Sequence, residues 1–435
     1  MCRPFATAEL RGSPDVGFLR ATQIHIVQPI FAKNVRPSLF VLACGLPFLG
    51  VEQARSQGCV AVRGGGFCML PHDESGQDPW TASVGYRWLH SDRHFVGDVE
   101  QTQRKANGTE VINDSHFVDL GITYQFTSRV SATLTLPFVY SDRSSFYEHS
   151  GGSPASGAQR GHSRAAGIGD LRLSSSVWLW DPAKHPKGNV QLGLGIKLPT
   201  GDYKATDTFN TVRGPEEHYV DQSIQPGDGA VGFSAEFYAY REIFERTSVY
   251  AQGFYMFNPK SVNGVSTEIA NPRGRTITAL NRTIANPAST PAQVATAQAR
   301  LNAATTLGYN NGYSLEDVMS VTDQYLARAG MSFTLVKSWG LAVSLGGRIE
   351  GVPVEDALGD SDGFRRPGYS ISIEPGITMM KGRFSASVYA PVALYRNRQA
   401  SVADKRWDQI VGGGTTGGDA AFADFVITTS ISYRF

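Results

Sequence analysis

The last fourteen residues of the chain (FADFVITTSISYRF) alternate between two kinds of side chain. One set of alternate positions is mostly apolar and ends in Ile431, Tyr433 and Phe435. The other set is mostly polar and includes Asp424 and Arg434. A period of two predicts a β-strand with one apolar face and one polar face. Because this strand stands last in the sequence, we expect it to pair with strands far back in the chain and, if the sheet closes, with the first strand.

The same alternation recurs from Trp80 onward and predicts twelve strands of about ten residues. The predicted strands are 80–89, 118–126, 130–138, 171–179, 190–198, 231–237, 249–257, 325–333, 341–349, 369–377, 384–394 and 422–435. Tight turns and long polar loops alternate between them. A tilted strand of about 9–11 residues crosses a bilayer, and short turns at one end with long loops at the other are typical of bacterial outer-membrane barrels.

The sequence therefore predicts an all-β fold: a closed, antiparallel, up-and-down transmembrane β-barrel of about twelve strands over residues 80–435, with short periplasmic turns and long extracellular loops. A secreted β-sandwich or propeller also has many alternating strands, but it does not account for the one-sided loop lengths. The aromatic residues expected in the interfacial girdles are Tyr86, Trp88, Tyr124, Phe126, Phe138, Tyr140, Tyr433 and Phe435. Pro375 and Pro391 fall inside predicted strands, where a residue without an N–H indicates a bulge or a shifted strand boundary.

The N-terminal part contains a short apolar segment, 39–51 (LFVLACGLPFLGV), which is too short to span a membrane as a helix. Basic residues precede the segment and the small residues Ala54 and Ser56 follow it, which is the pattern of a secretory signal peptide. The alternative is a buried helix, which the proline and glycines of the segment disfavour. We expect residues 1–56 to be leader and signal peptide, and 57–79 to be a periplasmic N-terminal segment.

Two cysteines, Cys59 and Cys68, would remain after cleavage. Neighbouring cysteines in an oxidising compartment predict a local disulfide. The longest predicted loop, 258–317, contains an Ala-rich run at Pro291–Thr305 with Thr290 before it. A capping residue followed by proline at the first helical position predicts a short helix there.

Charged residues occupy many of the positions that the alternation turns inward. They are Arg87, Asp119, Asp170, Arg172, Lys197, Glu236, Arg328, Arg348, Glu350, Glu374, Asp424 and Arg434. Ions inside a barrel must be paired or hydrated, because an isolated ion in a low dielectric is costly. One interpretation is a salt-bridge network that supports the wall and narrows the lumen. The other is a polar constriction that selects solutes, as charged rings do in channels.

The sequence offers no catalytic or metal-binding constellation. One known twelve-stranded outer-membrane barrel family is a phospholipase with a His-x-Ser pair, and none of the nine His here has Ser two residues on. The cluster 114–116 (DSH) is the closest, but adjacent side chains on a strand face opposite ways. The segment 360–363 (DSDG) resembles the start of a calcium loop, but Arg365 replaces the turn glycine. We therefore expect no enzyme activity, no metal and no cofactor.

Two segments, 167–173 (GIGDLRL) and 191–202 (QLGLGIKLPTGD), resemble the "GxGD … GxGxKLPTGD" core of a bacterial outer-membrane barrel family named for the MetA pathway of phenol degradation. The similarity covers the fourth and fifth predicted strands, and is weaker at 91–97 and at the C-terminal strand. The resemblance implies a transporter-like barrel that passes small hydrophobic or aromatic compounds, and it supplies no catalytic residues. The Ala-rich run 291–305 departs from the family pattern.

These observations predict a channel or transporter-like barrel for small solutes in the outer membrane of a Gram-negative bacterium, reached through the periplasm. The alternative is a structural or surface-binding barrel with a closed lumen, and an outer-membrane lipid hydrolase is the least favoured. The expected partners are outer-membrane lipids, small-molecule solutes and the barrel-assembly machinery, which would recognise Ile431, Tyr433 and Phe435 as a C-terminal signal. Nucleic acid is not expected, because 40 Lys+Arg balance 39 Asp+Glu to a net charge of +1.

Overall fold

The structure of this protein is a computed structural model. It describes residues 78–149, 154, 157–211, 214–267, 280–281, 283–306, 316–411 and 418–435. The chain divides into two compact units, and every described residue belongs to the second, 53–435. The expected leader and signal peptide, most of the 57–79 segment, and the expected Cys59–Cys68 disulfide lie outside the described residues.

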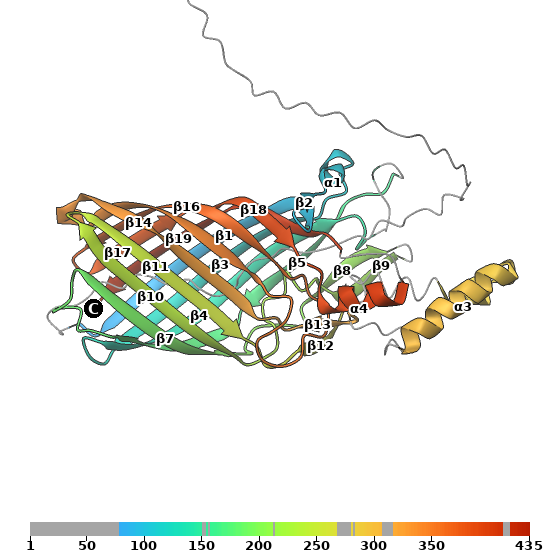
Figure 1. Ribbon diagram of the computed structural model, residues 1–435, viewed down its shortest axis with the longest axis horizontal. Coiled ribbons are helices and arrows are strands. Elements are labelled where there is room, and N and C mark those ends of the chain that lie inside the picture. The colour runs from blue at the N-terminus through green and yellow to red at the C-terminus, as the bar shows by residue number, and fades with distance from the viewer. Residues whose placement is uncertain are drawn as a thin grey trace, which may run out of the picture. The chain divides into compact units, whose positions relative to one another are not determined.

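Within the described part of the chain, antiparallel strands form one sheet that closes into a barrel with twelve wall positions (Figure 1). In chain order the positions are filled by β1 (Trp80–Val96), β3 (Ile112–Gln125), β4 (Val130–Ser145), β5 (Gly161–Ile168) with β6 (Leu171–Trp178), β7 (Gly188–Leu198), β10 (Gly232–Phe244), β11 (Thr247–Phe257), β14 (Gln324–Val336), β15 (Leu341–Val352), β16 (Gly368–Lys381), β17 (Phe384–Tyr389) with β18 (Val392–Arg398), and β19 (Ala420–Arg434). Neighbours in sequence are neighbours in the sheet, so the predicted up-and-down order is confirmed.

The last strand closes the barrel on the first. β19 pairs antiparallel with β1, and Ala82 lies opposite Tyr433. The Phe435 N–H donates to the Trp80 carbonyl at 2.9 Å, and the Trp80 N–H donates to the Phe435 carbonyl at 3.2 Å. The pairing predicted for the terminal strand is therefore the closure of the barrel.

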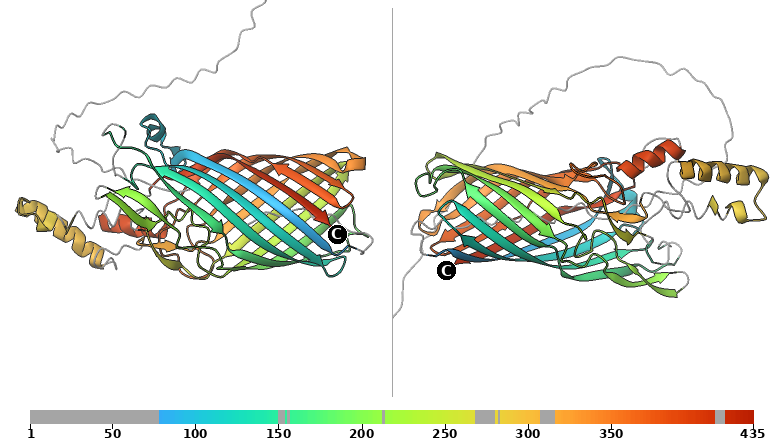
Figure 2. Two further views of the ribbon diagram at one scale, coloured as in Figure 1. Left: turned by 180° about the vertical axis from the view of Figure 1, so that it is seen from behind. Right: turned by 90° about the horizontal axis from the view of Figure 1, so that it is seen from below.

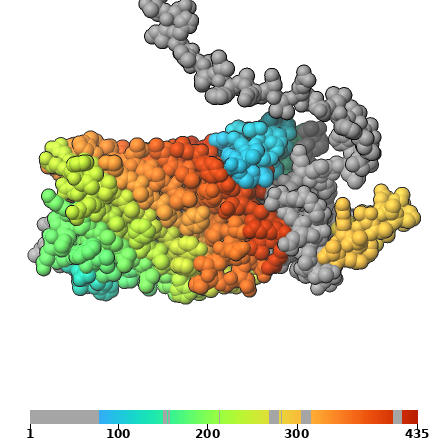
Figure 3. Space-filling view, in the orientation of Figure 1, coloured from blue at the N-terminus to red at the C-terminus, as the bar shows by residue number. Residues whose placement is uncertain are grey.

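The outside of the wall is apolar. Large side chains that point outward remain exposed, among them Leu194 (72%), Leu394 (68%) and Leu345 (55%). Figure 3 shows one face of this wall, where side chains of neighbouring strands form a continuous surface. An exposed apolar band of this extent is unfavourable in water and matches the lipid-facing side of a membrane barrel. The sheet is thus a transmembrane barrel.

The two ends of the barrel differ in the length of the connections between strands. Tight turns lie at the end that carries the C-terminus, and the long loops lie at the opposite, extracellular end (Figures 1 and 2). The turns are 126–129, 179–187, 245–246, 337–340 with the 3₁₀ turn η3 (Lys337–Trp339), and 382–383. The loops carry β2 (Val99–Glu100), α1 (Thr102–Ala106), the hairpin of β8 (Thr206–Thr211) and β9 (Gly214–Tyr219), the pair β12 (Val262–Ser266) and β13 (Val318–Ser320), α3 (Pro291–Thr306) and α4 (Val402–Val411).

The helix α3 begins with a capping box. The Gln293 N–H donates to Thr290 Oγ1 at 3.3 Å, and the Thr290 N–H donates to Gln293 Oε1 at 2.8 Å. Each side chain thus satisfies a donor that the first turn leaves unpaired. Of the helices that the structure describes, none is both long and apolar enough to cross a membrane.

Prolines interrupt the wall at two places. Pro137 in β4 lies opposite the gap between β5 and β6, where the Gly169 N–H still donates to its carbonyl at 2.8 Å. Pro375 in β16 lies opposite the gap between β17 and β18, where the Ala390 N–H donates to its carbonyl at 3.1 Å. Since proline has no N–H on that side, the neighbouring strand loses a ladder bond and breaks. Pro391 lies inside the second gap.

Several strands are longer than predicted. The predicted strands 130–138 and 171–179 leave a long loop between them, with 141–166 expected as loop; this was wrong at both ends, because β4 extends to Ser145 and β5 covers Gly161–Ile168. Polar residues such as Asp142 and Arg164 occupy these extensions and pair across the strands. The period-two rule misses them, since the wall above the lipid-facing band needs no apolar outer face.

Candidate functional site

A cavity of about 570 Å³ lies inside the barrel. Side chains of all twelve wall positions line it, from Arg87 on β1 and Arg348 on β15 to Arg434 on β19 and Gly340 in a periplasmic turn. Because every wall position contributes, the cavity is the barrel lumen. The inward faces of the strands therefore decide its chemistry.

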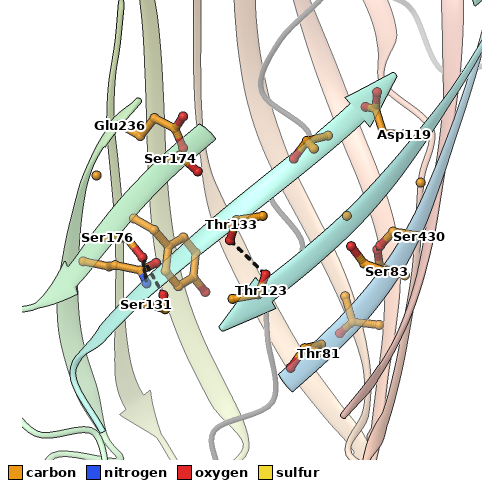
Figure 4. A pocket seen from close by; sticks show the side chains of 18 of the residues that line it. Thr81, Ser83, Asp119, Thr123, Ser131, Thr133, Ser174, Ser176, Glu236 and Ser430 are labelled. Carbon is orange, nitrogen blue, oxygen red and sulfur yellow. Dashed lines mark hydrogen bonds between the residues drawn. The ribbon is translucent and has the colours of Figure 1, made fainter. Parts of the chain in front are cut away.

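Hydroxyl groups cover the side of the lumen formed by β19, β1, β3, β4 and β6 (Figure 4). Thr123 and Thr133 pair through their hydroxyls at 2.8 Å, and Ser131 and Ser176 at 3.0 Å. These are cross-strand neighbours on the inner face. A hydroxyl has one donor and two acceptor sites, so each can still bind water or a solute. This side of the lumen is polar, and its hydroxyl groups stand beside the charged side chains of the same strands, such as Asp119 and Arg172.

Aromatic rings gather on the other side. Tyr238 and Tyr240 on β10 are stacked with centroids 6.1 Å apart, and Trp178 meets them edge-on at 6.2 and 6.0 Å. Tyr250 on β11 and Tyr389 on β17 line the same cavity. The alternation in the sequence turns these tyrosines inward, although only charged residues were predicted to line the lumen.

The charged groups meet in two clusters. In the first, Arg172 Nη2 lies 3.3 Å from Asp119 Oδ1, and Arg87 on β1 stands diagonal to Asp119, because Gly85 is the residue opposite Asp119. The Arg87 guanidinium also lies 4.3 Å from the centre of the Phe117 ring. Two guanidinium groups thus lie beside one carboxylate, and the three residues are the outermost cavity-lining positions of β1, β3 and β6.

The second cluster is an ion-pair chain. Arg348 donates to both oxygens of Glu350, at 3.1 and 2.9 Å, and to Glu374 at 3.1 Å. Arg328 donates to the other Glu374 oxygen at 3.0 Å and to Gln252 at 2.7 Å. Glu374 has no exposed surface. Each buried charge in this chain has a hydrogen-bonded partner, which offsets its desolvation.

The structure distributes the twelve predicted lumen residues over four places. Those that line the cavity are Arg87, Asp119, Arg172, Glu236, Arg328, Arg348 and Arg434. Glu350 and Glu374 are buried against Arg348. Asp170 and Lys197 lie where outer loops join the wall. Asp424 is near the outer end, where it pairs with Arg93 at 2.7 Å and Arg396 at 2.5 Å.

The place where outer loops join the wall gives a structural role to residues of the two motif segments, 167–173 and 191–202. Asp170 fills the gap between β5 and β6 and accepts the N–H groups of Gly201 and Asp228, both at 3.0 Å. Lys197 pairs with Asp228 and donates to Asn258 at 2.8 Å. A Cβ at Gly201 would lie 2.8 Å from backbone atoms of both neighbouring segments. Glycine is needed because three backbones meet there, so the motif residues hold loops to the wall.

The outer end of the lumen is packed with buried ion pairs that were not among the predicted lumen charges. Arg143 on β4 has no exposed surface and donates to Glu148 Oε1 at 3.0 Å and to Asn113 at 2.8 Å. Arg366 donates to Asp221 at 3.0 and 2.5 Å. We call Arg143, Glu148, Asp221 and Arg366 the outer network. It joins β4 to three loops, a meeting that no periodicity in the sequence signals.

Burial alone would raise the pKa of Asp221, but Arg143 and Arg366 reverse this and hold it well below its usual range. Asp221 is therefore ionised at neutral pH. A second buried pair, Arg365 with Asp356 at 2.6 Å, has no exposed side-chain surface on either partner. The outer loops are thus fixed by charge pairs in a water-excluded setting.

Titratable side chains also meet on the outside of the wall. Asp114 Oδ1 lies 3.0 Å from His116 Nε2, and the Tyr86 hydroxyl is bonded to His116 Nδ1 at 2.8 Å. Ser115 faces the other side, where Ser141 donates to its hydroxyl at 2.9 Å. The serine and the histidine of this cluster are therefore on opposite faces, as expected for a strand. Among the described residues, no group of three or more His, Cys, Asp or Glu side chains could hold a metal ion.

Neither a protein-family model nor a curated protein matches the chain. Solved structures do match. A crystal structure of an outer membrane channel from Pseudomonas putida F1 covers 86% of this chain and 100% of its own, with 11% identity and a TM-score of 0.45. The translocator domain of the autotransporter NalP from Neisseria meningitidis covers 84% and 91%, with 10% identity and a TM-score of 0.37. The P. putida toluene transporter TodX covers 83% and 91%, with 10% identity and a TM-score of 0.36. Similarity at this level carries no argument about function.

Proposed function

We propose that the protein is a passive channel or transporter for small solutes in the outer membrane of a Gram-negative bacterium. The supporting observation is a polar cavity, lined by every wall position, inside a wall whose outer face is apolar. A barrel that only anchored loops would have no need of an inner face so rich in hydroxyl and guanidinium groups. The protein would mature through the periplasm, with residues 1–56 removed.

The resemblance of the motif segments implies hydrophobic or aromatic solutes, and the lining narrows that range. Rings such as Tyr238 and Tyr389 offer contact to a ring-shaped solute. Next to a purely apolar solute, the hydroxyl groups and the arginines would lose bound water and would gain no hydrogen-bond partner in its place. The lumen therefore favours solutes that combine a ring with polar groups.

The predicted lumen charges would act as a constriction in this function. Arg87, Asp119 and Arg172 stand at the outer limit of the cavity, and the Arg348 chain faces the same lumen. Charges fixed at a narrow point discriminate between solutes by sign, as charged rings do in other channels.

The second candidate is a structural or surface-binding barrel with a closed lumen. The outer network favours it, because Arg143 and the carboxylates Glu148 and Asp221 are almost fully buried. If these pairs never open, no solute passes. The two candidates share one fold and differ only in conductance.

Single-channel recording of the refolded full-length mature chain in planar bilayers separates the two. The channel proposal expects stable ionic currents, and a double variant Asp221→Ala/Arg366→Ala should raise the conductance. A matched control is Lys337→Ala, which removes an exposed pair in a periplasmic turn. Absence of current in both the wild type and the double variant would refute the channel and favour the closed barrel.

A further inference from the structure

The charged side chains that line the cavity are unequal in sign. Six are arginines, from Arg87 on β1 to Arg434 on β19, and two are carboxylates, Asp119 and Glu236. Two more carboxylates are buried against Arg348. Six positive charges thus stand against four negative ones, an excess of two. In a lumen with low-dielectric walls such an excess favours a solute with negative charge.

The place for that charge is beside Asp119. Arg172 is bonded to this carboxylate at 3.3 Å, and Arg87 lines the same cavity from the adjacent strand, diagonal to Asp119. A planar guanidinium holds a second carboxylate through parallel N–H groups. Because two guanidinium groups lie beside the single carboxylate of Asp119, they have hydrogen-bond donors left for the carboxylate of a solute.

The aromatic side of the lumen is shaped to present rings to a solute. A Cβ at Gly376 would lie 2.5 Å from Cδ1 of Tyr389, so only glycine lets this ring lie against the wall. Gly346 serves Tyr250 in the same way, with a Cβ-to-hydroxyl distance of 2.6 Å. The Arg328 guanidinium lies 4.6 Å from the centre of the Tyr389 ring. Because these glycines have no side chain, the tyrosine rings can lie against the wall. The rings therefore line the lumen without filling it.

We propose that the lumen binds a small ring compound that carries a carboxylate group. The carboxylate would pair with Arg87 and Arg172, and the ring would contact Tyr238 and Tyr389. Further polar groups would reach the hydroxyl side seen in Figure 4. The cavity volume of about 570 Å³ lies within the range of small-molecule sites. Passage of this solute rests on the proposed channel function, whereas its binding does not.

The inference excludes two related kinds of solute. An apolar ring such as toluene leaves the guanidinium groups without a new partner. A cationic ring such as benzylammonium meets the positive excess near Arg87. Both should bind more weakly than benzoate, although the three rings are of similar size.

The test measures binding to the full-length mature protein by saturation-transfer NMR, with benzoate, glucuronate, toluene and benzylammonium as probes. Benzoate and glucuronate carry the shared carboxylate on an aromatic and on a saturated ring, so their comparison identifies the ring type. The expected order places one of these carboxylates first and benzylammonium last. Tighter binding of toluene or benzylammonium than of both carboxylates would overturn the proposal.

Substitutions of the proposed contact residues test where in the lumen the carboxylate binds. Arg87→Gln and Arg172→Gln should each weaken carboxylate binding roughly ten- to hundredfold, because each removes a charge-assisted hydrogen bond. The matched control is Arg383→Gln in an exposed periplasmic turn. Tyr238→Leu should weaken binding about three- to tenfold through loss of ring contact. Its control is Phe237→Leu, which changes the neighbouring, outward-facing ring.

Heat-modifiable gel migration shows which variants remain closed barrels, and Tyr389→Leu substitutes for Tyr238→Leu if that variant does not fold. Unchanged carboxylate binding in folded Arg87→Gln and Arg172→Gln would overturn the proposed site. Ionic current without carboxylate binding would refute this inference and leave the channel standing. Carboxylate binding without current would refute the channel and leave the site standing.

Discussion

Arg366 donates two hydrogen bonds to Asp221, at 3.0 and 2.5 Å, although 145 positions separate the two residues. The pair joins the loop before β16 to the loop before β10, and both side chains are buried. Arg143 on β4 lies 3.8 Å from the same carboxylate. One aspartate thus connects two loops and the barrel wall.

Removing one partner of this pair should be costly. Arg366→Ala would leave Asp221 buried with less compensation, and we expect a loss of about 3–5 kcal/mol in the free energy of unfolding. Urea unfolding of the refolded barrel measures it. Lys337→Ala, which breaks an exposed pair, should leave the midpoint unchanged. Equal midpoints for the two variants would show that the outer network does not stabilise the barrel.

The same pair makes the outer loops sensitive to acid. Burial opposes ionisation of Asp221, but Arg143 and Arg366 hold its pKa below the ordinary value of 3.8. A depressed pKa in the folded state gives stability that is present above pH 3.8 and is lost as the pH falls below it. The protection factors for hydrogen exchange in the loop before β10 should therefore fall as the pH drops below 4. Asp221→Asn should remove most of this pH dependence, and an unchanged profile in that variant would contradict the assignment.

Ion selectivity should follow the charges of the Arg348 chain. Glu374→Gln removes a buried negative charge that pairs with Arg348 and Arg328, so the lumen becomes more positive. We expect the reversal potential in a salt gradient to shift toward anions, and Arg348→Gln to shift it toward cations. Shifts in the same direction for both variants would be inconsistent with an electrostatic origin.

The glycine junction behind the motif segments should tolerate no side chain. Gly201→Ala places a Cβ 2.8 Å from backbone atoms of Gly169 and Gly227, which cannot move independently of the wall. We expect a loss of roughly 1–3 kcal/mol in stability. The control is Gly347→Ala, where nothing lies within 4 Å of the new Cβ. Thermal gel-shift midpoints of the two variants compare them directly.

The C-terminal residue should matter more for assembly than for the finished fold. Phe435 is half exposed on the lipid-facing side, and its backbone bonds to Trp80 form the last rung of the closure. If Phe435 is part of the signal for the barrel-assembly machinery, its deletion should lower insertion in cells while refolded protein keeps its heat stability. Phe126→Leu, at another exposed strand end, is the control. Normal insertion of the truncated chain would remove this role.

The strand pattern and the closure could be predicted because each rests on a local signal. Alternation with period two assigns a face to every strand residue, so the inward positions of Arg87 and Tyr238 and the outward position of Phe435 follow from the sequence. Pro375 and Pro391 likewise indicated an irregularity in the wall at this point of the sequence. In the strand extensions above the lipid-facing band, such as Gly161–Ile168, this signal is missing.

The sequence by itself thus determined the barrel and the alternation of its strands, because lipid outside and water inside impose a period of two. Only the tertiary structure decided which inward charged side chains line the cavity and which are buried in ion pairs with one another. Glu374 and Arg348 lie 3.1 Å apart from different strands, and Asp221 meets Arg366 across 145 residues. Such contacts depend on how strand tilt and loop packing bring distant side chains together, and a period along one strand carries no information about that.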